Sequence, residues 1–153
     1  MIGFCLGIIY SSLLEWLIHK YLLHTKNRKS PFFFHWHHHN ICRKNKNIDV
    51  NYYDTWFTTK DRIREVLSLI LIFLIHTPLI NISPGFVTAT GIFSTAYYFV
   101  HKKCHLDVQW GKKYFPWHFR HHMAGNQNYN WNILFPLFDI IFRTYNNGKK
   151  EKI

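Results

Sequence analysis

The chain has 153 residues, about one domain's length, of which 48% are hydrophobic and 19% aromatic. A composition this apolar excludes a disordered chain, and three cysteines are too few for a disulfide scaffold. The formal charge is +11, and 12 histidines outnumber the 8 acidic residues. The mean hydropathy of −0.17 resembles that of a soluble protein, but it averages over apolar and basic segments that alternate along the chain.

Three apolar segments predict membrane-spanning helices. Residues 2–18 carry one charge, at Glu15, and residues 66–80 and 86–100 carry none. The Asn-Ile-Ser-Pro-Gly sequence between the last two segments is typical of a turn, so these two segments should form a helical hairpin. Each segment is near the short limit of about 17–25 residues for a bilayer span.

Two alternatives compete with the membrane interpretation. Three buried helices of a soluble bundle would need polar outer faces, which these segments lack. A cleavable signal peptide at the N-terminus is disfavoured because no basic residues precede the first apolar segment. We therefore expect an all-α fold of about three spans with a helical cap.

The basic residues are confined to two polar segments, residues 19–65 and 101–153, which together contain all 19. By the positive-inside rule both segments face the cytoplasm, and the hairpin turn faces the opposite side. Attraction to anionic lipid headgroups accounts for the excess charge. No nucleic-acid-binding module is apparent, so nucleic acid is not an expected partner.

Ten histidines in four clusters of these polar segments are the candidate metal ligands. The clusters are His19 and His24; His35, His38 and His39; His101 and His105; and His118, His121 and His122. A four-residue spacing places His101 and His105 on one helix face, and each HX2HH triplet spans about 100° of a helix. His19 and His24 are about 140° apart on a regular helix, so they would reach different metals or lie where the helix ends.

Ten imidazoles are too many for one ion, since structural zinc takes four ligands. They suit two ions with four or five imidazoles each. Such neutral nitrogen ligands fit iron, cobalt, nickel, copper or zinc, and the spacing does not choose among them. A single histidine is usually an ordinary surface or core residue, but four clusters on one side of a membrane favour a dinuclear metal site. Cys42 and Cys104 form no CxxC pair, which argues against a zinc ribbon.

Other polar residues are candidates to orient a ligand through a hydrogen bond. Glu15 precedes His19 by four residues; the alternative is that it lies at the membrane edge towards the headgroups. His37 points away from its neighbours in HWHHH and is either spare or a supporting residue. Asp107 and Asp139 are weaker candidates, because surface carboxylates are the default. His76, inside an apolar segment, should be a satisfied polar group and not a ligand.

The order HX4H, HX2HH, HX3H, HX2HH resembles the membrane-bound fatty acid hydroxylase superfamily, which includes fatty acid 2-hydroxylases, sterol desaturases and C4-methyl sterol oxidases and is similar to carotenoid hydroxylases. The aromatic stretch 128–132, followed by Pro136, Asp139, Phe142 and Thr144, is similar to the family's closing Pro-x-x-Asp-x-x-Phe-x-Thr segment. The resemblance covers nearly the whole chain, which we treat as a single domain over residues 1–153.

The resemblance implies a helical membrane anchor capped by a cytoplasmic dimetal site, with iron expected and zinc possible in isolated protein. It implies O2-dependent hydroxylation of a lipid at the metal site, with no separate catalytic residue. The closing segment favours a fatty acyl or sphingolipid substrate; a sterol or carotenoid oxidase is an alternative. The protein would reside in the endoplasmic reticulum if eukaryotic or the inner membrane if bacterial.

The resemblance also has two departures. Relatives usually carry another apolar helix before the one leading into HX4H, so this chain is truncated, minimal or inactive. No fused electron-donor domain is recognisable, so a separate donor, such as a cytochrome b5 or a ferredoxin, would supply electrons. The competing functions are a non-enzymatic metal-binding protein of the same family and, less well supported, a metal transporter. A transporter would place polar residues near the bilayer midplane, where only His76 lies.

Overall fold

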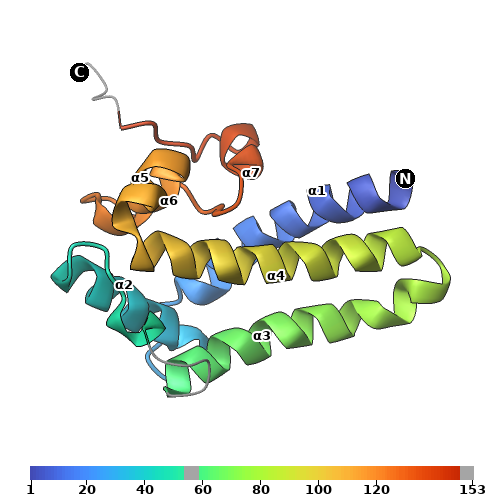
Figure 1. Ribbon diagram of the computed structural model, residues 1–153, viewed down its shortest axis with the longest axis horizontal. Helices are drawn as coiled ribbons and strands as arrows, with labels where there is room; N and C mark the ends of the chain where they lie inside the picture. The colour runs from blue at the N-terminus through green and yellow to red at the C-terminus, as the bar shows by residue number, and fades with distance from the viewer. Residues whose placement is uncertain (54–58, 149–153) are drawn as a thin grey trace.

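The computed structural model describes residues 1–53 and 59–148, and over these ranges it is helical with no strand. This agrees with the expected all-α fold. Three long helices run side by side, and shorter helices gather around one end of them (Figure 1). The long helices are α1 (Ile2–Leu17), α3 (Lys60–His76) and α4 (Pro84–Leu106), and the short ones are α2 (Phe34–Lys44), α5 (Val108–Tyr114), α6 (Pro116–Met123) and α7 (Leu137–Ile141).

The predicted hairpin is formed by α3 and α4. Thr59 begins α3, where its side-chain oxygen accepts a hydrogen bond from the Arg62 backbone N–H. A 3-10 turn, Thr77–Asn81, follows α3, and Pro84 occupies the first turn of α4, where its missing N–H costs no hydrogen bond. The observed helices are longer than the apolar segments because their polar ends continue into the histidine-bearing region.

Small residues let α1 approach α4 closely. A Cβ atom added to Gly7 would lie 2.7 Å from the Cβ of Ala89 and 2.7 Å from the carbonyl oxygen of Phe86. Such small-residue contacts are typical of helices that pack within a membrane. The same helix α4 also packs against α3, so it forms the middle layer of the three (Figure 1).

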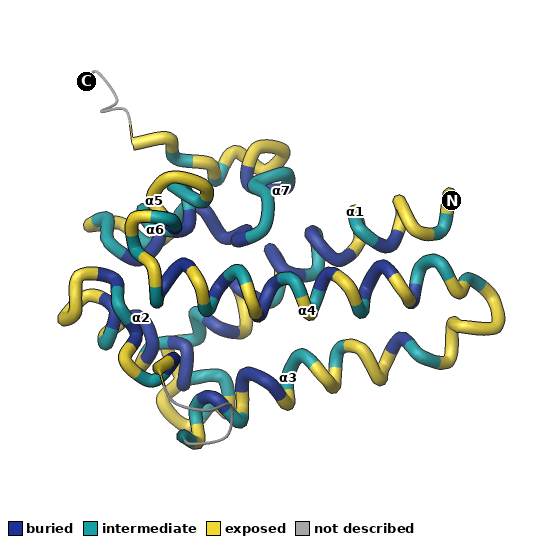
Figure 2. Tube along the Cα trace, viewed as in Figure 1, coloured by how far each residue is buried: buried dark blue, intermediate teal, exposed yellow. Residues whose placement is uncertain are grey.

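Two helical stretches, Ile2–Leu23 and Lys60–Asn81, are long and apolar enough to cross a membrane. Only 33% and 17% of their most apolar windows are buried, so much of each helix is exposed (Figure 2), and its exposed residues include large hydrophobic ones. The third expected span, 86–100, lies in α4, which does not meet the same criterion; its Thr90, Ser94 and Tyr97 side chains lower its hydropathy. The number of spans therefore remains a prediction.

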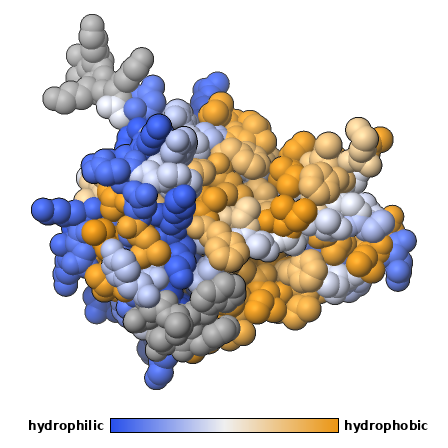
Figure 3. Space-filling model, viewed as in Figure 1, coloured by the Kyte–Doolittle hydropathy of each residue, from blue (hydrophilic) through white to orange (hydrophobic). Residues whose placement is uncertain are grey.

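Polar and apolar surfaces are separated along the long axis. The end formed by α2, α5 and α6 is hydrophilic, whereas the body formed by the long helices is hydrophobic (Figure 3). The histidine clusters lie at the junction between the two, since His19 follows α1 and His101 and His105 end α4.

Candidate metal centre

The structure brings nine of the ten candidate histidines into two groups of converging ring nitrogens. Within each group, one nitrogen from each member lies within 4.8 Å of those from all the others. Group A comprises His19, His24, His35, His39 and His121, and group B comprises His38, His101, His105 and His122. The tenth, His118, lies beside group B, with its Nε2 atom 3.0 Å from that of His105.

Each HX2HH triplet is divided between the two groups. His35 and His39 of α2 belong to group A, while His38 between them belongs to group B. In α6, His121 belongs to group A and His122 to group B. The arc of about 100° that the triplet covers is wide enough for its members to reach two adjacent sites.

A π-helical turn, Ile18–Leu23, brings His19 and His24 into the same group. The backbone N–H of His24 donates to the carbonyl oxygen of His19 at 3.1 Å, which is a bond between residues five apart. This wider turn realigns two side chains that a regular α-helix would separate. The expectation that they would reach different metals is wrong, and the alternative that they lie where the helix ends describes the geometry.

Backbone carbonyls of the closing segment orient two ligands of group A. The Nδ1 atom of His121 donates to the Tyr129 carbonyl at 2.7 Å, and that of His19 donates to the Trp131 carbonyl. Asn130 lies between these two carbonyls with φ +60°, a left-handed conformation that asparagine tolerates better than most residues. The left-handed conformation of Asn130 lets the carbonyl groups on either side of it face the same site.

Group B has a different set of acceptors, two of them carboxylates. Each donor is an Nδ1–H, so the Nε2 lone pair is left to face the group. The pairs are His38 with Asp49 (2.6 Å), His101 with Glu65 (3.1 Å) and His105 with the Asn47 carbonyl (2.9 Å).

The buried imidazoles have the chemistry of metal ligands. Burial lowers the pKa of His121 to about 4, and it lowers the pKa of His35, His38, His39, His118 and His122 well below the ordinary value. These rings are therefore neutral at pH 7, as imidazole ligands must be.

Several nitrogen atoms of the centre also lack an ordinary partner. The Nε2 atom of His35 lies 2.9 Å from that of His19 and 3.0 Å from that of His39, so lone pairs converge. Among the described residues, His101 Nε2 and both ring nitrogens of His122 have no hydrogen-bond partner although they are buried. Burying a nitrogen atom without a hydrogen-bond partner raises the free energy of the folded state. A cation bound between these atoms would remove that penalty. The residues present therefore fit two divalent ions.

Glu15 and Asp139 act on the backbone, not on a ligand ring. Glu15 is buried and accepts from the backbone N–H of Ile133 at 2.6 Å, which excludes the alternative of a headgroup-facing carboxylate. Asp139 accepts from the N–H groups of Trp131 and Asn132 at 2.9 and 2.8 Å. Together they fix the segment whose Trp131 carbonyl orients His19.

Of the two other candidates, His37 is the spare residue, one of the two roles expected for it, and Asp107 is wrong as a supporting residue. His37 is exposed, and its Nδ1 atom lies 3.3 Å from Asp61, on the outer face of α2. Asp107 is exposed and caps α5 by accepting from the Trp110 N–H at 3.0 Å. His76 lies apart from both groups and bonds to the Tyr10 hydroxyl at 2.9 Å, as expected of a satisfied polar group.

Three supporting residues were not anticipated from sequence: Asp49, Glu65 and Gln127. The amide oxygen of Gln127, in the orientation that satisfies its neighbours, accepts from His39 Nδ1 at 2.9 Å. The one signal in the sequence that could have pointed to Asp49 and Glu65 is that acidic residues are scarce in this chain of charge +11. Nothing in the local spacing connects Asp49 with His38 or Glu65 with His101.

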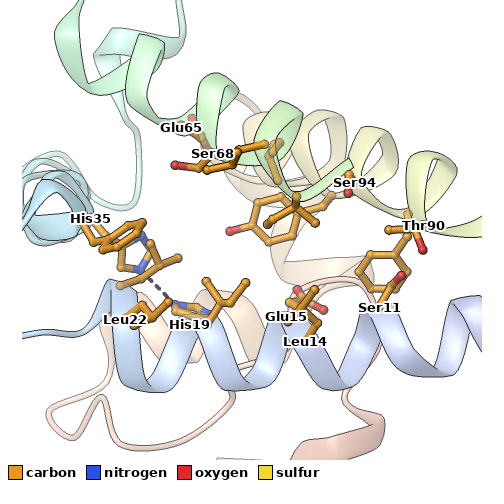
Figure 4. Close-up of a pocket in the computed structure, with 18 of the residues that line it drawn as sticks. Ser11, Leu14, Glu15, His19, Leu22, His35, Glu65, Ser68, Thr90 and Ser94 are labelled. Atoms are coloured by element: carbon orange, nitrogen blue, oxygen red, sulfur yellow. Dashed lines mark hydrogen bonds between the residues drawn. The ribbon is translucent and has the colours of Figure 1, made fainter. Parts of the chain in front are cut away.

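An apolar cavity of about 220 Å³ lies between α1, α3 and α4 and ends at group A. His19 and His35 lie at one end, and Ser11 and Thr90 lie at the other (Figure 4). The walls between them are mostly aliphatic and aromatic, with Ile72 of α3 and Phe93 of α4 among them. The cavity thus connects the hydrophobic body of the molecule to one of the two histidine groups.

The fold and this site define a class of protein: a helical bundle with membrane-compatible helices and two histidine groups at its polar end. The family model for fatty acid hydroxylases matches residues 4–144. The chain therefore belongs to the fatty acid hydroxylase family, as its motifs indicated. Comparison with curated proteins and with solved structures finds no match. Family membership implies an oxygenase-type, membrane-associated enzyme with a histidine-rich metal site.

Proposed function

We propose that this protein hydroxylates a carbon atom of a lipid acyl chain, with a fatty acyl or sphingolipid substrate. The reaction converts R–H, O2, two electrons and two protons into R–OH and water. Two metal ions, iron by expectation, would be held by groups A and B and would supply the oxidising power that side chains lack. The observation that carries the proposal is the cavity, which ends at His19 and His35.

The cavity suits an extended hydrocarbon chain. Its wall runs along α1 from Ser11 and continues through the π-helical turn to Leu23. Leu14, Ile18 and Ile72 contribute apolar surface, so an acyl chain would be held by burial of its methylene groups. These walls also limit water near the reacting carbon, which protects reactive species from side reactions.

The polar end of the molecule would face the cytoplasm. All 19 basic residues lie in the segments that precede or follow the apolar helices, and none lies in the turn between α3 and α4. This arrangement supports an integral membrane location, in the endoplasmic reticulum or a bacterial inner membrane. A separate donor, such as a cytochrome b5 or a ferredoxin, would deliver the electrons on that side.

Lipid mass spectrometry of a host that makes no hydroxylated acyl lipids would test the proposal. Cells that express the chain with a working electron donor should accumulate an oxygenated lipid. A His19→Ala variant should not accumulate it, whereas His37→Ala, whose side chain is outside both groups, should. Full metal loading without any product would instead favour a non-enzymatic metal-binding protein of the same family.

A further inference from the structure

We propose that groups A and B are unequal metal sites, and that group B binds a divalent metal ion more tightly. The inference rests on the proposed function only in requiring that both groups hold metal. It comes from the groups that accept the Nδ1–H bonds of the ligands: carboxylates behind group B and neutral oxygens behind group A.

Two buried carboxylates stand behind group B. Asp49 is 0% exposed, and its Oδ2 atom lies 2.6 Å from His38 Nδ1. Glu65 is 6% exposed, and its Oε1 atom lies 3.1 Å from His101 Nδ1, an atom that is also 2.9 Å from the Tyr52 hydroxyl. A carboxylate that accepts from an imidazole raises the basicity of the other ring nitrogen, and so strengthens its bond to a metal.

Arg62 holds both carboxylates in place. Its guanidinium lies 3.5 Å from Asp49 and 2.5 Å from Glu65, and it stacks at 3.7 Å over the ring of Tyr52. The Tyr52 hydroxyl in turn donates to Glu65 at 2.9 Å. Two carboxylates against one guanidinium leave a net negative charge buried behind group B, and a cation in that group would offset it.

In the described part of the chain, no carboxylate takes a comparable position next to group A. Its oriented ligands donate to the carbonyls of Trp131 and Tyr129 and to the amide oxygen of Gln127. Within residues 1–53 and 59–148, no carboxylate accepts a hydrogen bond from a group A imidazole. Neutral acceptors set the ring orientation but polarise the imidazole less, so a metal in group A should be held less tightly.

The weaker group is the one that adjoins the cavity. His19 and His35 of group A line it, whereas no histidine of group B does so among the described residues. The geometry therefore assigns group B to anchoring one ion firmly and group A to presenting the more loosely held ion to the substrate cavity.

A titration of the metal-free protein in detergent with Co²⁺ alone would test this inference, with the visible absorption of Co²⁺–imidazole complexes as the readout. We expect two phases of one equivalent each, with affinities that differ by about tenfold or more, since supporting residues typically change affinity by about 10–100-fold. His105→Ala should remove the tight phase, and His121→Ala should remove the weak one. Two phases of equal affinity, or the reverse assignment, would overturn the inference.

Three isosteric variants test the carboxylates themselves. Asp49→Asn keeps the oxygen that caps the Asn51 N–H but removes the charge, and should weaken the tight phase by about 10–100-fold. Glu65→Gln should act in the same direction if Asp49→Asn fails to fold. Gln127→Glu, which places a carboxylate behind His39, should strengthen the weak phase. A tight phase unchanged in Asp49→Asn and Glu65→Gln would contradict the proposal.

The titration needs neither O2, lipid nor electrons, so its outcome is separate from that of the proposed function. Two Co²⁺-binding phases of different affinity, in a protein that forms no product, would contradict the hydroxylase proposal and support the inequality of the two groups. Equal phases in an active hydroxylase would do the opposite.

Discussion

The imidazole rings of His39 and His122 are stacked, with centroids 4.0 Å apart and planes inclined by 15°. Because His39 belongs to group A and His122 to group B, this stacked pair places the two groups in direct contact. A substitution in the stacked pair should therefore affect metal binding at both groups. A substitution of a histidine outside the pair should affect only the group to which that histidine belongs.

We predict that His122→Ala lowers the metal content at both groups, while His105→Ala lowers it at group B alone. Loss of the His122 ring removes a group B ligand and also the surface against which His39 is packed. Metal analysis of the purified variants measures this directly. A His122→Ala protein that retains the full group A content would show that the stacked pair does not couple the groups.

A bulky side chain in the cavity should block the substrate but not the metals. In Ile72→Trp, an indole would occupy space that is now lined by Ile72. Hydroxylation of long acyl chains should fall at least about tenfold, the effect of a barrier rise of about 1.4 kcal/mol, with metal content unchanged. Leu74→Trp is the matched control, because Leu74 is 54% exposed on the same helix. Equal activities in the two variants would place the substrate elsewhere.

Asp139→Ala should be far more destabilising than its size suggests. The change leaves the buried N–H groups of Trp131 and Asn132 without their acceptor, at about 1–3 kcal/mol each. The thermal midpoint should fall, and group A should lose metal because the Trp131 carbonyl moves. Asp107→Asn, at an exposed helix cap that asparagine also satisfies, should leave both measurements near those of the unchanged protein.

Gly7→Ala should destabilise the packing of α1 on α4 by about 1–3 kcal/mol, the usual range for overpacking. The new methyl group would collide with Ala89 and with the backbone of Phe86. Gly125→Ala provides the control, since nothing lies within 4 Å of its added Cβ. Unfolding in detergent would compare the two, and an equal stability of both variants would contradict the close helix contact.

The metal-free protein should lose stability as the pH falls from 7 to 5. The pKa of His121 is about 4 in the folded chain and near 6.5 when unfolded. Between these values the unfolded chain binds a proton that the folded chain does not, so acid favours unfolding. Thermal unfolding across this range measures the effect.

Local spacing predicted the helical hairpin, and it singled out histidines of which nine converge in two groups; that they bind metal stays a prediction. Periodicity and composition encode a helix face, so His101 and His105 do lie together in group B. The division of each HX2HH triplet was not predictable, since it depends on how α2 and α6 are placed against the other helices. The π-helical turn at His19 could not be predicted either, because no residue type in the sequence indicates such a turn.

The supporting residues were the least predictable part of the site. Asp49 and Glu65 were not candidates because each contacts a histidine that no local spacing connects with it. Asp139 was a candidate, but its contacts are with backbone groups of a folded loop. Asp107 is an ordinary surface carboxylate, and His37 points away from its neighbours as its place in HWHHH predicted. Burial distinguishes the two sets: the three active carboxylates are all under 9% exposed, and burial is a property of the assembled fold.

Hydroxylation itself can be measured with purified protein that holds two metal ions per chain, a working electron donor, an acyl lipid and isotopically labelled O2. We expect one labelled oxygen atom in the lipid as a hydroxyl group, and no such product with His121→Ala. Lipid that carries no labelled oxygen, from protein with full metal content and a donor shown to reduce it, would contradict the central claim.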